Sequence, residues 1–155
     1  MYSEDDMLML SGIQNYRNIL RRYIRDYCDC QEVDDAVRVL DANKLYALHA
    51  EDKAKLMRFE GIASNSYFEV LPKLILNQKE SFPFNGRNRR PPKDAVNAML
   101  SLAYTLIAND CAAALETVGL DPYVGFLHAL RPGRTSLALD MMEEFRAYLG
   151  DRFVL

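Results

Sequence analysis

Three acidic side chains near the C-terminus have the spacing of one helix face. Asp140, Glu143 and Glu144 stand at i, i+3 and i+4, so a helix would place them together. The apolar residues of the same segment fall on the opposite face: Ala138, Met141, Met142, Phe145 and Leu149. The acids have two interpretations. They form either the solvated face of an amphipathic helix, the more common case, or a set of hard oxygen ligands whose mutual repulsion a magnesium or manganese ion relieves.

A histidine and a more distant glutamate could take part in such a site. His128 stands between an apolar segment and a loop that carries Arg131 and Arg134, one short segment before the carboxylates. This stretch therefore offers a nitrogen ligand, oxygen ligands and cations for phosphate. Glu60 lies between apolar neighbours in RFEGIASNSYF, and by itself it is equally consistent with a surface residue. The other histidine, His49, is predicted to be a core residue bonded to a carbonyl.

Basic residues gather in a loop, although the chain has a formal net charge of −3. The string NGRNRRPPK at residues 85–93 contains no acid and carries Arg87, Arg89, Arg90 and Lys93. Nucleic-acid binding depends on clustered Lys and Arg that neutralise phosphates, so the net charge argues against a protein that coats nucleic acid. Any contact with a polyanion is predicted to begin at this loop, and the alternative is a solvated charged loop.

Apolar residues recur at helical spacing through most of the chain. The pattern predicts a helix that starts at Ser3, a second over 33–48, a third from Glu51 into the seventies, and a last one from about Ser136 to Leu149. Pro83, Gly86, Pro91 and Pro92 make 77–92 a loop. A largely buried helix follows it and ends before Gly119, and a short helical segment is expected to end near His128. No segment alternates as a half-buried strand does, so the predicted fold class is all-α.

Length and composition limit the class of protein further. The 155 residues, half of them apolar, suffice for one domain with a core. The start of the chain does not have the pattern of a signal peptide, and no apolar run approaches the roughly 18 residues of a membrane span, which predicts a cytosolic protein without a membrane partner. Cys28, Cys30 and Cys111 support neither a disulfide framework nor a zinc ribbon and are predicted to be reduced thiols.

Three separated strings together resemble a known family. RFEGIASNSYFEVL, FPFNGRNRRPPKDAVNAMLSLAYTLI and GLDPYVGFLHALRPGRTSLALDMMEEFR, in this order, are similar to the motif blocks of the CRISPR-associated integrase of the spacer-acquisition machinery, particularly its type I forms. The string SGIQNYRNILRR near the start also resembles the family's first helices. The blocks extend from about residue 58 to 146, and agreement of several strings is more specific than one short motif.

The resemblance implies a metal site and a reaction. Glu60, His128 and Glu143 fall on the family's ligands for Mn²⁺ or Mg²⁺, and Asp140 matches an acid that supports the site or contacts the metal. In the family, the bound ion polarises a phosphodiester of the repeat, and a 3' hydroxyl of the incoming DNA attacks it. The cations that would hold DNA phosphates are Arg87, Arg89, Arg90, Arg131 and Arg134. Tyr67 and Tyr104 either line this site or, as buried helical tyrosines usually do, belong to the core.

The resemblance also implies a larger protein. Family members usually begin with a strand-rich domain that forms the homodimer and contacts a small CRISPR-associated partner protein, and their helical domain continues beyond the end of this chain. Residues 1–155 are therefore expected to be an incomplete, helical, metal-binding catalytic domain that acts on double-stranded DNA, both incoming spacer and repeat.

Two other functions remain open at this point. One is a non-catalytic helical module from the same family that binds DNA or protein, which a metal titration would distinguish. The other is a zinc hydrolase, which fits less well because the chain has neither a Cys pair nor an HExxH string.

Overall fold

The computed structural model describes residues 4–27, 30–50, 52–128 and 131–155, and every regular element within them is a helix. The elements are α1 (Glu4–Asp26), α2 (Gln31–Leu48), α3 (Lys53–Leu74), α4 (Ala95–Thr117), α5 (Ser136–Phe145), the π-helical segment η1 (Arg146–Asp151) and α6 (Arg152–Val154). The all-α prediction is confirmed over these ranges. The predicted helix starts at Ser3 and Glu51, and the thiol of Cys28, lie outside the described residues.

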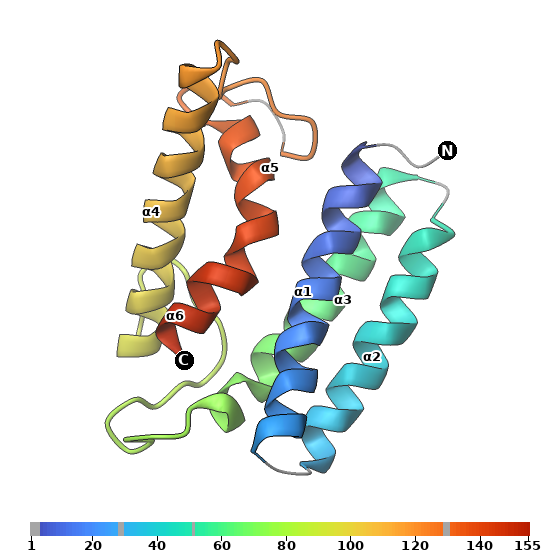
Figure 1. The fold of residues 1–155 in the computed structure, drawn as a ribbon, viewed down its shortest axis with the longest axis vertical. Helices are drawn as coiled ribbons and strands as arrows, with labels where there is room; N and C mark the ends of the chain where they lie inside the picture. Colours follow the sequence, from blue (N-terminus) through green and yellow to red (C-terminus); the bar gives the residue numbers. More distant parts are fainter. Residues whose placement is uncertain (1–3, 28–29, 51, 129–130) are drawn as a thin grey trace.

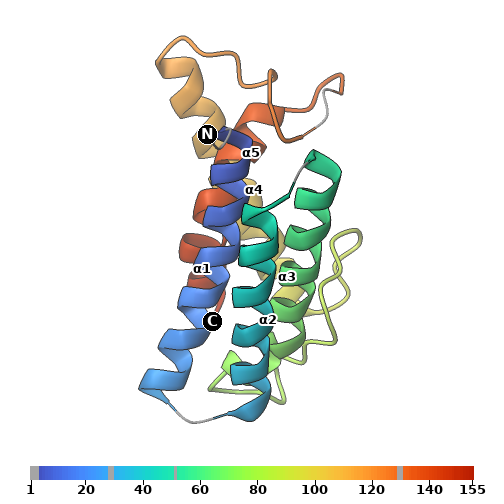
Figure 2. The same ribbon diagram turned by 90° about the vertical axis from the view of Figure 1, so that its right-hand side faces the viewer.

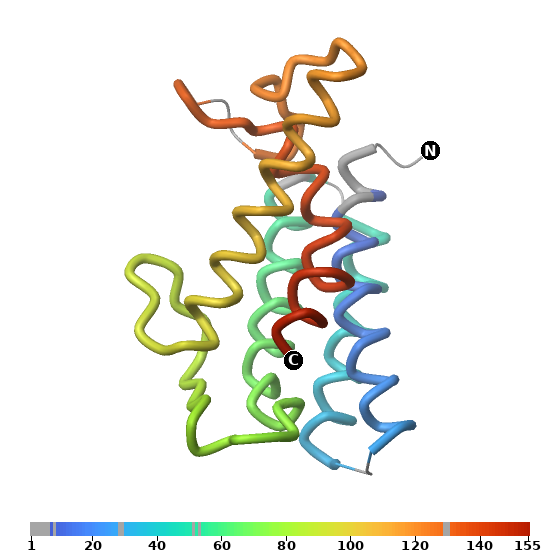
Figure 3. Tube along the Cα trace, turned by 60° about the vertical axis from the view of Figure 1, so that its left-hand side comes forward, coloured from blue at the N-terminus to red at the C-terminus, as the bar shows by residue number. Residues whose placement is uncertain are grey.

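The helices form two groups that α1 connects. α1, α2 and α3 pack on one another, α4 packs against α5 and η1, and α1 contacts both α5 and η1 (Figure 1). Successive long helices run in opposite directions, and Figure 2 shows the three helices of the first group standing side by side. The loop before α4 projects beside the lower end of that helix (Figure 3). The two groups therefore face each other across α1, α3 and α5.

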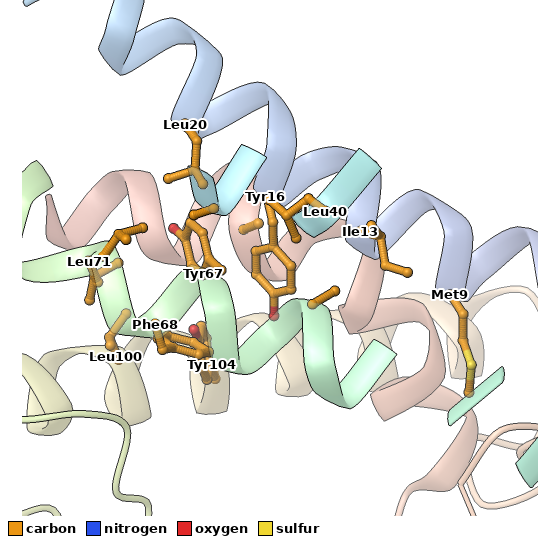
Figure 4. Packing of buried hydrophobic residues seen from close by; sticks show 14 of the residues in the cluster. Met9, Ile13, Tyr16, Leu20, Leu40, Tyr67, Phe68, Leu71, Leu100 and Tyr104 are labelled. Atoms are coloured by element: carbon orange, nitrogen blue, oxygen red, sulfur yellow. The ribbon is translucent and has the colours of Figure 1, made fainter. Parts of the chain in front are cut away.

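An aromatic cluster fills the core where α1 meets α3. The rings of Tyr16 and Tyr67 are stacked with centroids 4.3 Å apart, and Phe68 meets the Tyr67 ring edge-on at 5.2 Å. Tyr104 of α4 is also buried and belongs to the same core cluster (Figure 4). Such pairs add about 0.5–1.5 kcal/mol each beyond the burial of their area. Tyr67 and Tyr104 are core residues, the more usual of the two alternatives.

α4 is more exposed than its composition predicts. Val96, Leu100 and Leu115 face the core, but Leu102 and Leu106 are 62% and 55% exposed. Among the described residues, α4 is the one helix long and apolar enough to cross a membrane, with a mean hydropathy of 1.4 and 28% of the window buried. Core helices of soluble proteins pass the same test, so this is weak evidence for a membrane. The prediction of a largely buried helix is wrong, because α5 and η1 cover only part of its surface.

Two local predictions are also wrong. Residues 119–128 form turns rather than a short helix, because the amides of residues 126–128 are bound by a side chain of α5 instead of by preceding carbonyls. His49 bonds to the carbonyl of Leu45 through Nδ1, at 2.8 Å, as predicted, but it is exposed rather than in the core.

Candidate metal and DNA site

The three predicted ligands line one cleft. Glu60 of α3, His128 of the loop after α4 and Glu143 of α5 border a cavity of about 520 Å³. The remaining lining residues come from α1, α3, the two basic loops and the start of η1: Met9, Gly12, Met57, Gly61, Ser64, Asn65, Arg89, Leu127, Arg131, Arg134 and Arg146. Side chains separated by up to 83 positions in the sequence thus meet where the two helix groups face each other.

Asp140 holds His128 in place from beneath the cleft. Its carboxylate is fully buried and accepts the backbone N–H groups of Phe126, Leu127 and His128 at 2.7–3.0 Å. Nδ1 of His128 lies 2.6 Å from Oδ1 of the same carboxylate. Burial opposes ionisation of Asp140, but the hydrogen bonds from His128 and the three amides outweigh it and hold the pKa of the carboxyl below its ordinary value. Because an ionised carboxylate can only accept, Nδ1 carries a proton, and in the neutral ring Nε2 then presents its lone pair.

This arrangement depends on a glycine in the loop. A Cβ atom on Gly125 would lie 2.6 Å from the backbone carbon of Ser136 and 2.7 Å from Oδ2 of Asp140. The loop backbone therefore approaches the start of α5 too closely for any other residue. Gly125 permits the contact through which three amides reach one carboxylate.

The acidic helix face is divided between buried and exposed positions. Asp140 is 0% exposed and Glu143 is half-buried, whereas Glu144 is exposed. The interpretation as a solvated acidic face therefore holds for Glu144 alone. Met141 and Phe145, predicted on the apolar face, are 37% and 38% exposed.

Glu143 and Glu60 share the cleft with a buried cation. The guanidinium of Arg146 is hydrogen-bonded to Glu143 Oε1, and its Nη1 donates to the Tyr16 hydroxyl at 3.2 Å. Burial raises the pKa of Glu60; the charge of Arg146 opposes this shift, and the charge of Glu143 adds to it. Among the described residues, no three His, Cys, Asp or Glu side chains form a ready ligand shell. Oε1 of Glu143 is engaged by Arg146.

Arg146 belongs to a polar network behind the cleft. Asp151 is fully buried and accepts a hydrogen bond from the Tyr104 hydroxyl. Burial raises the pKa of Asp151 to about 6, against the hydrogen bond of Tyr104, the nearby Tyr67 hydroxyl and the charge of Arg146. Arg87 and Arg146 both lie over the Tyr104 ring, at 5.3 and 5.5 Å from its centroid. The network therefore links α1, α3, α4 and η1 around one tyrosine.

The five predicted DNA-binding arginines occupy different environments. Arg89, Arg131 and Arg134 line the cleft, and Arg90 is exposed on the loop before α4. Arg87 points inward: its Nη1 donates to Asn88 O and Asn97 Oδ1, each at 2.8 Å. Asn97, fully buried, also accepts the N–H of Asn88 at 2.9 Å and donates to Gly86 O at 3.0 Å. Arg87 thus fixes the loop, and Arg89, Arg131 and Arg134 form the cationic rim of the cleft.

The donor set of the cleft fits a divalent cation. Two carboxylates and an imidazole whose second nitrogen bonds a carboxylate are ligands that Mn²⁺ accepts, and such an outer carboxylate commonly orients a metal-binding histidine. The residues that would hold the ion are Glu60, His128 Nε2 and Glu143.

Four residues that matter to this geometry were not singled out from the sequence: Gly125, Asn97, Arg146 and Asp151. The string EEFR does place an arginine three positions after Glu143, on the same helix face. A polar residue within the apolar period of α4 was the available signal for Asn97. Nothing local in the sequence marks Gly125 or Asp151, because each acts through a contact made by tertiary folding.

The fold and cleft define an all-helical protein with an imidazole and carboxylates beside a cationic rim, as expected of an enzyme or module that handles phosphodiesters. Residues 7–155 match the family model described as CRISPR associated protein Cas1. The chain belongs to the Cas1 family.

Individual relatives agree with this assignment. The chain is 45% identical over 150 residues to the CRISPR-associated endonuclease Cas1 of Leptospira interrogans, covering 95% of the chain and 59% of the relative. The structure of a Cas1 protein from Thermotoga maritima matches with a TM-score of 0.78 and 28% identity, covering 97% of the chain and 44% of that protein. A chain of a Cas6-RT-Cas1–Cas2 complex matches with a TM-score of 0.82 and 26% identity, covering 97% of the chain and 16% of that longer chain. The chain thus spans about half the length of the curated relatives it matches, 59% and 44% for two of them.

Proposed function

We propose that this chain is the metal-dependent catalytic domain of a CRISPR spacer integrase, which cleaves DNA and joins a DNA 3' hydroxyl to a phosphodiester of the repeat. The observation that carries this proposal is the meeting of Glu60, His128 and Glu143, from three separate segments, in one cleft with arginines at its rim. Relatives at 45% identity are named endonucleases, which supports the same reaction class.

Each side chain of the cleft has a role in this proposal. Glu60, His128 and Glu143 hold Mn²⁺ or Mg²⁺, and Asp140 is a positioning residue that directs Nε2 of His128 into the cleft by binding Nδ1. When bound, the ion stabilises the charge that develops on the phosphoryl oxygens. Arg89, Arg131 and Arg134 orient the phosphates of the substrate at the rim. The half-buried position of Glu60 and Glu143 limits competition from water for the same donors.

The proposed partners are double-stranded DNA and a small protein of the Cas2 kind. A structural relative is part of a Cas6-RT-Cas1–Cas2 complex, which supports a small partner in the assembled state. The incoming spacer and the repeat are the proposed DNA substrates, and homodimerisation through a strand-rich domain is proposed for the full-length form.

The test begins with ion binding. Adding Mn²⁺ to the chain is expected to raise its melting temperature by several degrees, since a ligand at 100 times its Kd stabilises the folded state by about 2.7 kcal/mol. His128→Ala and Glu143→Ala should abolish the rise, and Glu144→Gln, an exposed neighbour, should keep it. Differential scanning fluorimetry measures this. No shift in the wild type, or an equal shift in all variants, contradicts the metal site.

The reaction is tested separately from the ion. A labelled duplex with a free 3' hydroxyl, incubated with Mn²⁺, a repeat-bearing plasmid and the Cas2-like partner, should become joined to the plasmid with the wild type and not with Glu60→Gln. Gel electrophoresis resolves the joined product. Nicking and joining that persist in Glu60→Gln would place the chemistry elsewhere.

One observation favours a second candidate, a non-catalytic DNA-binding module. Arg146 is hydrogen-bonded to Glu143, so a side chain of the protein itself supplies positive charge at the place proposed for the ion. A module of this kind would bind DNA in a salt-dependent manner but show neither an ion-induced shift nor strand joining.

A further inference from the structure

Among the described residues that line the cleft, Arg146 is the one buried guanidinium. It is 7% exposed, lines the cleft, and contacts Glu143 on one side and the Tyr16 hydroxyl on the other. The charges that act on Glu60 include those of Arg146 and Glu143. Two acids that face the same small volume repel each other unless a cation lies between or beside them. Arg146 supplies such a positive charge beside Glu143.

A second acceptor for Arg146 stands behind it. Asp151 ends the π-helical segment that Arg146 begins, and its charge interacts with that of Arg146. Oδ2 of Asp151 and Nε of Arg146 are both buried, and neither has a hydrogen-bond partner among the described residues. An unmatched buried acceptor and an unmatched buried donor on adjacent turns are costly, by about 1–3 kcal/mol for each group. A guanidinium that moved away from Glu143 would therefore find a carboxylate within its own helical segment.

We propose that Arg146 is a built-in counter-ion that blocks Glu143 in the ion-free protein and releases it to a divalent cation by turning toward Asp151. This inference rests on the proposed function, since it assumes that the cleft binds an ion. Arg146 is thereby a positioning residue that sets the affinity and selectivity of the cleft for divalent ions. A monovalent cation gains less from the two carboxylates and so displaces Arg146 less readily.

Two substitutions should move ion affinity in opposite directions. Arg146→Gln removes the competing charge, so isothermal calorimetry should show Mn²⁺ binding about tenfold tighter, although the ion-free melting temperature falls. Asp151→Asn removes the alternative acceptor, so Mn²⁺ should bind several times more weakly. If Arg146 only stabilised the fold, Arg146→Gln would lower the melting temperature and also weaken Mn²⁺ binding. Arg152→Gln and Glu144→Gln, exposed neighbours with the same charge changes, serve as controls and should bind Mn²⁺ as the wild type does.

If a single variant fails to fold because one buried charge is left unpaired, the double variant still tests the proposal. Arg146→Gln with Asp151→Asn removes both charges and should bind Mn²⁺ as tightly as Arg146→Gln, because Asp151 acts only through Arg146. In the wild type, titration with Mg²⁺ should shift the Nε–H signal of Arg146 in NMR spectra. Wild-type ion binding with that signal unmoved, or with Arg146→Gln no tighter than wild type, overturns the counter-ion role alone. Absence of Mn²⁺ binding in the wild type contradicts the proposed function and this inference with it.

Discussion

At the scale of single residues, the cleft depends on side chains that hold other side chains. The carboxylate of Asp140 accepts hydrogen bonds from three loop amides and from the His128 ring. The ring is thereby held in the tautomer that leaves Nε2 as an acceptor. Glycine at position 125 is the condition for this arrangement, because a Cβ there would collide with Ser136 and Asp140.

Substitution of Gly125 should therefore damage both stability and the histidine. Gly125→Ala is expected to lower the free energy of unfolding by about 1–3 kcal/mol, since the loop must move to make room for the methyl group. It should also break the contact of His128 with Asp140, which the ring signals in NMR spectra would report.

The matched control is Gly61→Ala, because a Cβ at Gly61 meets nothing within 4 Å. This helical substitution should raise stability by roughly 0.5–1 kcal/mol in urea unfolding. A Gly125→Ala protein as stable as the wild type would show that the close approach is not maintained in solution.

At the scale of elements, one asparagine joins the basic loop to α4. Asp94 caps α4 by accepting the N–H of Asn97 at 2.7 Å, and the Asn97 side chain then binds Gly86, Asn88 and Arg87. A loop of this length would otherwise be mobile, and its cationic side chains would lose conformational freedom on binding a phosphate. The start of α4 and the loop that carries Arg89 are thus held together.

Loss of Asn97 should release this loop. Asn97→Ala leaves the Arg87 guanidinium and the Asn88 amide without their buried acceptor, which should cost about 1–3 kcal/mol. Trypsin is expected to cleave after Arg87 and Arg89 much faster than in the wild type, as followed by mass spectrometry. Asn109→Ala, at an exposed position of the same helix, provides the comparison. Equal cleavage rates in the two variants would contradict the anchoring role.

At the scale of the whole molecule, the cleft exists because two helix groups meet. Glu60 belongs to the first group and Glu143 to the second, while His128 lies on a loop of the second. The same meeting brings Arg89, Arg131 and Arg134 to one rim. A chain with a net charge of −3 thereby presents a local cationic surface.

This surface should control the salt dependence of DNA binding. Arg89→Gln, Arg131→Gln and Arg134→Gln are each expected to weaken duplex binding and to reduce the slope of log K against log salt by about 1. Fluorescence anisotropy at several salt concentrations measures the slope. Arg22→Gln, on the far part of α1 and paired with Asp26, should leave it unchanged. A uniform loss across all four variants would indicate nonspecific charge attraction instead of a defined rim.

The sequence by itself determined the helical class, most helix boundaries to within a few residues, the family, and three of the side chains that line the cleft. Helical periodicity and motif strings are local properties of the sequence, so they can be recognised without knowledge of the fold. Tertiary structure alone decided that Asp140 is buried while Glu144 is exposed, that Arg87 points inward, and that Arg146 is buried beside the Tyr16 hydroxyl. These outcomes depend on burial and on partners up to 130 positions away, such as the Tyr16 hydroxyl for Arg146. The same long-range packing left Leu102 and Leu106 of α4 exposed, because apolar period shows which residues share a face but not whether a neighbour covers it.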